Sequence, residues 1–179
     1  MAKGDVAELL ADARETYGVF GKAQRALAIV DRVLVMEPRS VEALNLKAAI
    51  LYELDRDDEA EACNRQALEA EPCSVEALHG MAALANDRAD YPAALQWTDR
   101  GLACIPNDPY PEFVENEDYR QRLIAEIVNE KAFALWYTGR KDEAKKLLTE
   151  DGPEWCPLEV ETLEDQLDWL EHHPTSPEE

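Results

Sequence analysis

The chain repeats itself at a fixed interval, and this repeat constrains the fold more than any other feature of the sequence. Residues 37–44 read EPRSVEAL, and the segment returns 34 residues later, at 71–78, as EPCSVEAL. The same interval separates further residues of one type: Leu10, Leu44 and Leu78; Ala26, Ala60 and Ala94; Leu34, Leu68 and Leu102; and Pro38, Pro72 and Pro106. Several such sets of recurring residues (the repeat columns), all with the same interval, are typical of an array of similar units that stack on one another.

The first half of a unit has the pattern of an amphipathic helix. Ser40 is a good N-cap, and Glu42 lies in the first turn, where the helix dipole favours a negative charge. Leu44, Ala48 and Leu51 then share one face of the helix and form an apolar stripe.

The second half of the unit predicts another helix, packed closely against the first. A turn at residues 55–57 separates the two, and Pro72 follows the second helix because proline cannot continue a helix interior. The small side chains of Ala60 and Ala67 allow the two helices to approach each other. One such hairpin cannot bury its apolar stripe alone, so neighbouring hairpins must stack.

This pattern resembles the tetratricopeptide repeat. That family has a large apolar residue at the fourth place of a unit, small or apolar residues at the eighth and eleventh, alanine at the twentieth and proline at the thirty-second. The matching residues here are Leu10, Tyr17, Ala26 and Pro38; Leu44, Ala48, Leu51, Ala60 and Pro72; and Leu78, Ala82, Ala85, Ala94 and Pro106. Arg14 departs from the pattern at an eighth place. The resemblance implies an all-α fold, a right-handed α-solenoid of antiparallel helix hairpins, over roughly residues 5–157.

A fourth unit follows an insertion. Residues 139–144, GRKDEA, have the form of a repeat turn, which places the start of the unit at Ala125, so residues 109–124 are inserted. From about Glu117 the inserted residues predict a helix that extends the fourth unit at its front. We therefore expect one domain over residues 1–172, with units at 7–40, 41–74, 75–108 and 125–157. Residues 158–171 predict a C-terminal capping helix, and residues 173–179 predict a disordered acidic tail.

The charge of the chain limits its partners. The net charge is −21, from 18 basic and 39 acidic residues, and such a surface repels nucleic acid and anionic membranes. We expect a neutral or basic partner, although acidity can also serve solubility alone. The sequence has no apolar run of membrane-spanning length. Cys63, Cys73, Cys104 and Cys156 lack CxxC spacing, and we interpret them as reduced thiols of a cytoplasmic protein.

The sequence contains no pattern typical of catalysis, and we expect neither an enzyme nor a cofactor. It has no glycine-rich phosphate loop, no GxSxG and no HExxH. The acidic turn at residues 55–59 coincides with a repeat turn and lacks the glycine of a calcium loop. His172 and His173 offer only two ligands in the tail, so no metal site is expected.

The resemblance implies that the second, fifth, ninth and twelfth places of each unit line a concave groove that contacts a ligand. Acids occupy the second place: Glu8, Glu42, Glu76 and Glu126. Their negative charge can also be explained by the helix dipole alone. The candidate groove residues are Asn45, Tyr52, His79, Asn86, Asn129, Phe133 and Trp136. We expect Asn45, His79 and Asn129 to hydrogen-bond a bound chain and to contribute little to stability. Phe133 and Trp136 are expected to anchor the chain, and the alternative is that these two aromatics pack against the C-terminal helix.

The leading functional hypothesis is therefore a protein- or peptide-binding adaptor that uses this groove. Two alternatives stay open. One is a small secretion-type chaperone for a client protein, since those are also short, acidic and built from a few such repeats. The other is a structural scaffold that self-assembles through its ends, for example as a homodimer.

Overall fold

All regular secondary structure in the described part of the chain is helical. The computed structural model describes residues 3–18, 22–107 and 117–149. Its elements are α1 (Lys3–Tyr17), α2 (Ala23–Met36), α3 (Val41–Glu53), α4 (Asp57–Ala70), α5 (Val75–Asp87), α6 (Tyr91–Cys104), the short 3-10 helix η1 (Ile105–Asn107), α8 (Glu117–Tyr137) and α9 (Lys141–Thr149). The all-α class predicted from the repeat is confirmed.

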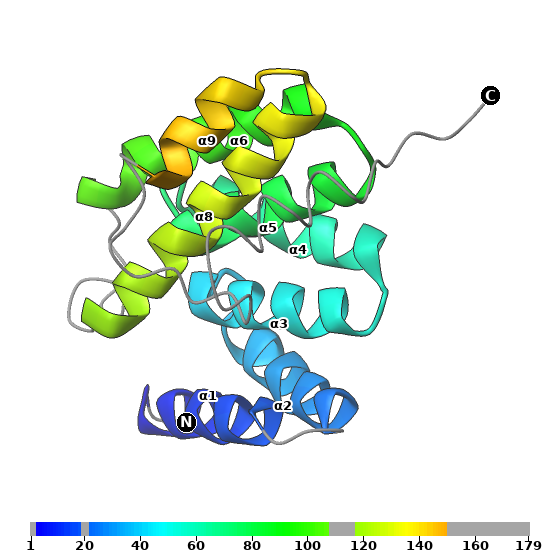
Figure 1. Cartoon of the computed structure of the whole chain (residues 1–179). Coiled ribbons are helices and arrows are strands. Elements are labelled where there is room, and N and C mark those ends of the chain that lie inside the picture. Colours follow the sequence, from blue (N-terminus) through cyan, green and yellow to red (C-terminus); the bar gives the residue numbers. More distant parts are fainter. Residues whose placement is uncertain (1–2, 19–21, 108–116, 150–179) are drawn as a thin grey trace.

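The helices form antiparallel hairpins that stack in sequence order. Each first helix packs against the helix that follows it, giving the pairs α1–α2, α3–α4, α5–α6 and α8–α9. Each second helix also contacts the first helix of the next pair, and the first helices contact one another along one side of the stack. Figure 1 shows the array rising from α1 and α2 at one end to α8 and α9 at the other. The fold is an α-solenoid, as predicted.

The repeat columns of the sequence form the core. Leu10, Leu44 and Leu78 at the fourth place are buried, with Val128 in the same role in the fourth hairpin. Ser40 caps α3, because its hydroxyl accepts a hydrogen bond from the backbone N–H of Ala43.

The turn inside each later hairpin also repeats. Asp55, Ala89 and Gly139 take positive φ angles of 55°, 56° and 81°, the left-handed conformation that ends a helix tightly. The residue after each turn then donates its backbone N–H to a carbonyl of the preceding helix; the first of these bonds joins Arg56 to Leu51 at 2.9 Å. The structure therefore repeats its turn geometry even where the residue types differ.

The close helix crossings lead to a first stability prediction. Ala60 and Ala94 are fully buried at equivalent places, where the second helix of a hairpin crosses the first. Ala60→Leu or Ala94→Leu is therefore expected to overpack the crossing and lower the free energy of unfolding by about 1–3 kcal/mol. Chemical denaturation measures this loss, and the exposed Ala62→Leu on α4 serves as the control. Unchanged unfolding of both buried variants would mean that these alanines do not lie at the helix crossings.

The inserted residues lengthen α8 at its front. The helix begins at Glu117, where the sequence predicts an extension, and its first turns lie beside α5 and the end of α6. Leu123 and Ile127 are buried together with Val75, and Tyr119 and Ile105 pack against them. The extension is therefore part of the packed structure, and it stands beside the concave side of the stack.

The interpretation of all four cysteines as reduced thiols is wrong for two of them. Cys73, in the turn before α5, and Cys104, at the end of α6, form a disulfide bond with their Cα atoms 5.2 Å apart. Stacking brings the ends of consecutive second helices together, so two cysteines without CxxC spacing become neighbours. Cys63 is a buried thiol, and burial raises its pKa. Because disulfides persist mainly in oxidising compartments, the argument from reduced thiols to a cytoplasmic location no longer holds.

Some expectations lie outside the described residues. These are the capping helix at 158–171, the acidic tail at 173–179, Cys156 and the proline-containing first part of the insertion at 109–116. In the part of the chain that is described, no helix is both long and apolar enough to cross a membrane.

Candidate functional site

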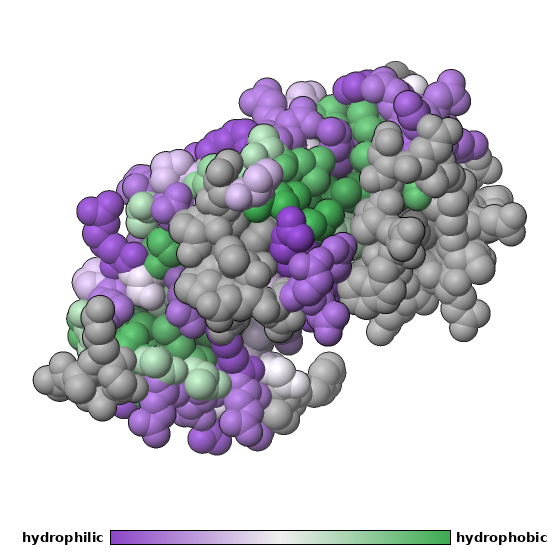
Figure 2. Space-filling view, turned by 90° about the vertical axis from the view of Figure 1, so that its left-hand side faces the viewer, coloured by the Kyte–Doolittle hydropathy of each residue, from purple (hydrophilic) through white to green (hydrophobic). Residues whose placement is uncertain are grey.

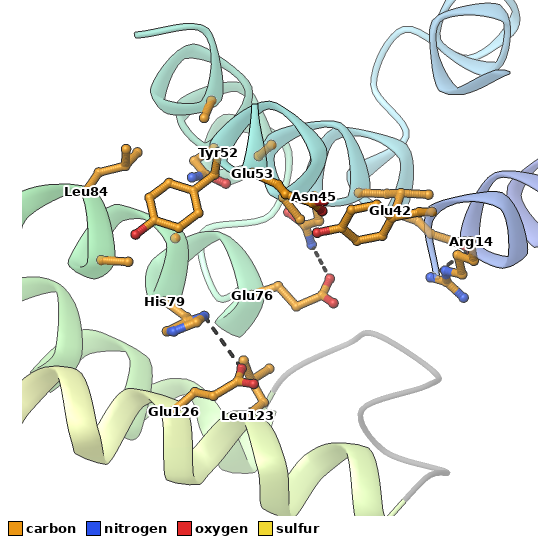
Figure 3. Close-up of a pocket in the computed structure, with 18 of the residues that line it drawn as sticks. Arg14, Glu42, Asn45, Tyr52, Glu53, Glu76, His79, Leu84, Leu123 and Glu126 are labelled. Atoms are coloured by element: carbon orange, nitrogen blue, oxygen red, sulfur yellow. Dashed lines mark hydrogen bonds and ion pairs between the residues drawn. The ribbon is translucent and has the colours of Figure 1, made fainter. Parts of the chain in front are cut away.

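A cavity opens on the concave side of the stack, between the first helices of the hairpins. Its volume is about 560 Å³, and residues of α1, α3, α5 and α8 line it, together with two residues of α4. Ala49, Gly80 and Ala83 contribute small surfaces to its wall, which leaves the space between the helices open. Figure 3 shows side chains from α3, α5 and α8 converging on this space. The extension of α8 adds Tyr119, Arg122 and Leu123, which sequence reasoning did not place in the groove.

Gly80 allows α5 to approach α4 closely beside this cavity. A Cβ atom at this position would lie 2.5 Å from Nδ2 of Asn64, a buried side chain of α4. A side chain at this position would therefore force Asn64 to move, and it would also take up space in the cavity.

Asn45 lines the cavity, but its amide is used within the protein. The side chain is only 7% exposed, and its Nδ2 donates to Ser74 Oγ at 3.0 Å and to Glu76 Oε2 at 2.8 Å. Both partners belong to the next hairpin, so Asn45 joins two repeats. The expectation that the fifth place contributes little to stability is wrong at this residue, because its hydrogen bonds bridge the stack.

Asn45→Ala is therefore expected to lower the free energy of unfolding by about 1–3 kcal/mol, the cost of leaving buried partners unsatisfied. Urea denaturation measures the change. Gln66→Ala, on the exposed face of α4, is the control and should stay within about 0.5 kcal/mol of the parent. Equal stability of Asn45→Ala and the parent would mean that these bonds contribute nothing to the stack.

Tyr52 and His79, two of the candidate groove residues, also line the cavity. The ring of Tyr52 is 40% exposed, and its hydroxyl donates to Asp87 Oδ2 at 2.7 Å. Burial lowers the pKa of His79 to about 4, so its imidazole is neutral at neutral pH. Its Nδ1 lies 3.9 Å from Glu126 Oε2, a contact that is not an ion pair in this state. A neutral imidazole can both donate and accept a hydrogen bond, which suits contact with a bound chain.

Asn86 lies between α5 and α8 and, like Asn45, connects two hairpins. Its Nδ2 donates to the backbone carbonyl of Glu130 at 3.0 Å and to Glu130 Oε2 at 2.6 Å. Burial raises the pKa of Glu130, the hydrogen bond from Asn86 partly opposes this rise, and the neighbouring carboxylates of Asp87 and Glu126 add to it. The ionised form of this carboxyl is therefore disfavoured in the folded protein.

Glu130→Gln is expected to raise the free energy of unfolding at neutral pH by about 0.5–2 kcal/mol, since it removes a buried charge and keeps an acceptor for Asn86. A carboxyl whose pKa is raised by folding lowers stability above that raised pKa, and the loss disappears below the ordinary pKa of glutamate. The stability gained by Glu130→Gln should therefore disappear as the pH falls from the raised pKa of Glu130 to the ordinary pKa of glutamate. Urea denaturation at neutral and acidic pH measures it, and a gain that is equal at every pH would exclude an electrostatic origin.

The remaining three candidates are carried by α8, away from the cavity wall. Trp136 is 3% exposed and packs with Ala132, Leu135 and Ala144, so it belongs to the core between α8 and α9. Phe133 is half-buried in a ring cluster, with its centroid 4.6 Å from that of Tyr137. Asn129 is half-buried on the same helix. The structure thus brings Asn45, Tyr52 and His79 together at the cavity and places the other four elsewhere.

The acids at the second place of the units take part in contacts between repeats. Glu42 pairs with Arg14 at 3.0 Å, and Glu76 accepts the hydrogen bond from Asn45. Glu126, beside His79, has a pKa raised by burial, an effect that Arg122 opposes. Position in the helix dipole is therefore only part of the explanation for these glutamates. In the sequence, these contacts are indicated by an acid at the second place of one unit together with a polar residue in the first helix of the preceding unit.

On the face in Figure 2, hydrophobic residues form patches bordered by hydrophilic ones. Within residues 3–18, 22–107 and 117–149, no three His, Cys, Asp or Glu side chains are grouped so that they could hold a metal ion.

Comparison with known proteins supports the fold. No family model and no curated protein matches the sequence. Among solved structures, the chain is similar to the crystal structure of MamA protein, with a TM-score of 0.62 and 14% sequence identity. The match covers 94% of this chain and 76% of that chain. A similarity at this identity shows a shared α-solenoid fold and no more.

Proposed function

We propose that this protein is a binding module that holds a segment of another protein in the cavity on its concave side. The observation that carries the proposal is the cavity itself, whose volume of about 560 Å³ is within the range of known ligand sites. Its walls come from four consecutive hairpins, so an elongated ligand could contact several repeats at once. The same arrangement suits an adaptor or scaffold that recognises a protein through a short segment.

The residues proposed to contact the ligand are Tyr52 and His79, since both line the cavity and neither is fully enclosed by the core. Ala49 and Ala83 supply a small apolar surface between them, and Leu123 closes the opposite wall from α8. Asn45 supports the site indirectly by holding α3 against α5. A binding role rather than a catalytic one fits a site whose polar groups are mostly engaged with one another.

The test is binding to an array of random decapeptides by the parent protein and by two matched variants. Ala49→Trp fills the cavity from an exposed position of α3, whereas Ala62→Trp adds the same ring to the outer helix α4. We expect the parent to select a reproducible set of peptides, Ala49→Trp to bind them about tenfold or more weakly, and Ala62→Trp to bind them as the parent does. Selection by all three proteins alike would place the binding surface outside the cavity, and no selection by the parent would refute the proposal.

A further inference from the structure

Tyr52 presents an exposed aromatic ring to the cavity, and the acids Asp87 and Glu130 come one helical turn after the cavity-lining residues Ala83 and Glu126. Tyr52 is an exposed large side chain in the cavity wall, and its hydrogen bond to Asp87 fixes the ring against α5. Burial and the bond to this carboxylate raise the pKa of Tyr52, so the phenol stays neutral. The charge of Glu130 on α8 raises the pKa of Tyr52 as well, less than burial and Asp87 do.

The acids around this ring are held by neutral donors. The Tyr52 hydroxyl donates to Asp87, and the Asn86 amide donates to Glu130. Such donors fix the positions of the two carboxyl groups without the positive charge that an arginine would bring. Acids on the outer helices are arranged differently, because they pair with arginines: Glu59 with Arg56, Glu61 with Arg65 and Arg88, and Glu143 with Arg140. In the described part of the chain, the acids next to this end of the cavity are therefore held in place by neutral donors rather than by arginines.

A buried acceptor beside these acids also lacks a donor. Asn86 is 7% exposed, and its Oδ1 is a buried side-chain atom without a hydrogen-bond partner in the described part of the chain. Its Nδ2 is committed to Glu130, which fixes the orientation of the amide. Unsatisfied buried acceptors are rare in folded proteins, and this oxygen adds negative potential beside Glu130.

The chemistry of the site indicates an organic cation rather than a metal ion. Among the described residues the acids are not grouped closely enough to coordinate a metal. A lysine or arginine side chain is long enough to lay its alkyl stem along Ala49 and Ala83 and to bring its charged end to the acids. The face of the Tyr52 ring attracts such a charge as well.

We propose that this end of the cavity binds a lysine or arginine side chain of the partner, with its cationic group between the Tyr52 ring and the carboxylates of Asp87 and Glu130. This inference rests on the proposed function and names the chemistry of the segment that is bound. The charge of Glu126, partly offset by Arg122 at 3.8 Å, adds to the attraction along the α8 wall. The raised pKa of Glu130 is consistent with a carboxyl that lacks a cation until the ligand is present.

The experiment measures the affinity of a blocked decapeptide of alternating lysine and serine. Its counterpart carries norleucine in place of lysine, which keeps the alkyl stem and removes the charge. We expect the lysine peptide to bind about tenfold or more tightly than the norleucine peptide, and Asp87→Asn/Glu130→Gln to lose about tenfold in affinity for it. Both substitutions keep an acceptor oxygen, and circular dichroism verifies that the variant is folded.

A matched control separates the site from the general acidity of the protein. Glu69→Gln/Asp142→Asn removes the same two charges from exposed positions on α4 and α9, and it should change the affinity by less than about threefold. Tyr52→Phe keeps the ring and should retain binding, whereas Tyr52→Leu should lose several-fold. Equal losses in the site variant and the control variant would overturn the inference. A second result would also overturn it: the parent protein selects array peptides that contain no lysine or arginine, and Ala49→Trp abolishes their binding. That result would still support the proposed function, because the cavity would bind a peptide of another chemistry.

Discussion

Trp136→Ala is expected to lower the free energy of unfolding by about 3–5 kcal/mol, the usual cost of removing a large buried aromatic side chain. The indole is 3% exposed and fills the space between α8 and α9, where it packs against Leu135 and Ala144. The ammonium groups of Lys141 and Lys145 lie 4.5 and 5.6 Å from the centre of the ring and stabilise it further. Because α9 is short, the loss should open the fourth hairpin first. Denaturant titration measures the free energy, and hydrogen exchange locates the opening.

The control for this variant is an exposed apolar residue. Val35 on α2 is 83% exposed, and Val35→Ala should change stability by no more than about 0.5 kcal/mol. The competing interpretation, that Trp136 is an anchor for a ligand, predicts the opposite pattern. Under that interpretation Trp136→Ala would keep the stability of the parent and lose affinity for selected peptides.

Removing the disulfide is expected to cost about 3–4 kcal/mol of stability. The bond joins residues 31 apart, and cross-linking a loop of that length restricts the unfolded chain by about this amount. Cys73→Ser/Cys104→Ser should therefore unfold at a lower denaturant concentration than the oxidised parent. The bond also holds the end of α6, where Ile105 packs near the start of the α8 extension, so hydrogen exchange in α8 should become faster.

A reductant provides the internal control for the disulfide. It should shift the unfolding midpoint of the parent toward that of the double variant, and it should leave the double variant itself unchanged. An unchanged midpoint of the parent in reductant would mean that both cysteines are thiols, as the sequence alone suggests.

The repeat was sufficient to predict the fold, because the residues that recur at its fixed interval are the ones that pack neighbouring helices together. Leu44, Ala48 and Ala60 are buried where the period places them, and the insertion turns helical at Glu117 as its sequence predicts. These features depend on residues within one hairpin or on its immediate neighbour. A fixed period therefore carries the information that is needed to find them.

The site was only partly predictable, because it depends on how one repeat is tilted against the next. That tilt brings Glu76 to the amide of Asn45 and Glu130 to the amide of Asn86, so two expected ligand contacts are internal bonds. The insertion has no place in the repeat register, and nothing in its sequence indicated that Leu123 would line the cavity. Trp136 shares a unit place with Tyr52, yet the packing of α9 buries it.

The central claim is that the concave cavity binds a segment of another protein, and hydrogen exchange with a peptide selected from the array tests it most directly. Peptide at saturating concentration should slow exchange in the first helices α3, α5 and α8, where the cavity walls lie. It should leave the outer faces of α2, α4 and α6 unchanged. Slowed exchange confined to the outer helices, with α3 and α5 unaffected, would contradict the account and place the binding surface on the convex side.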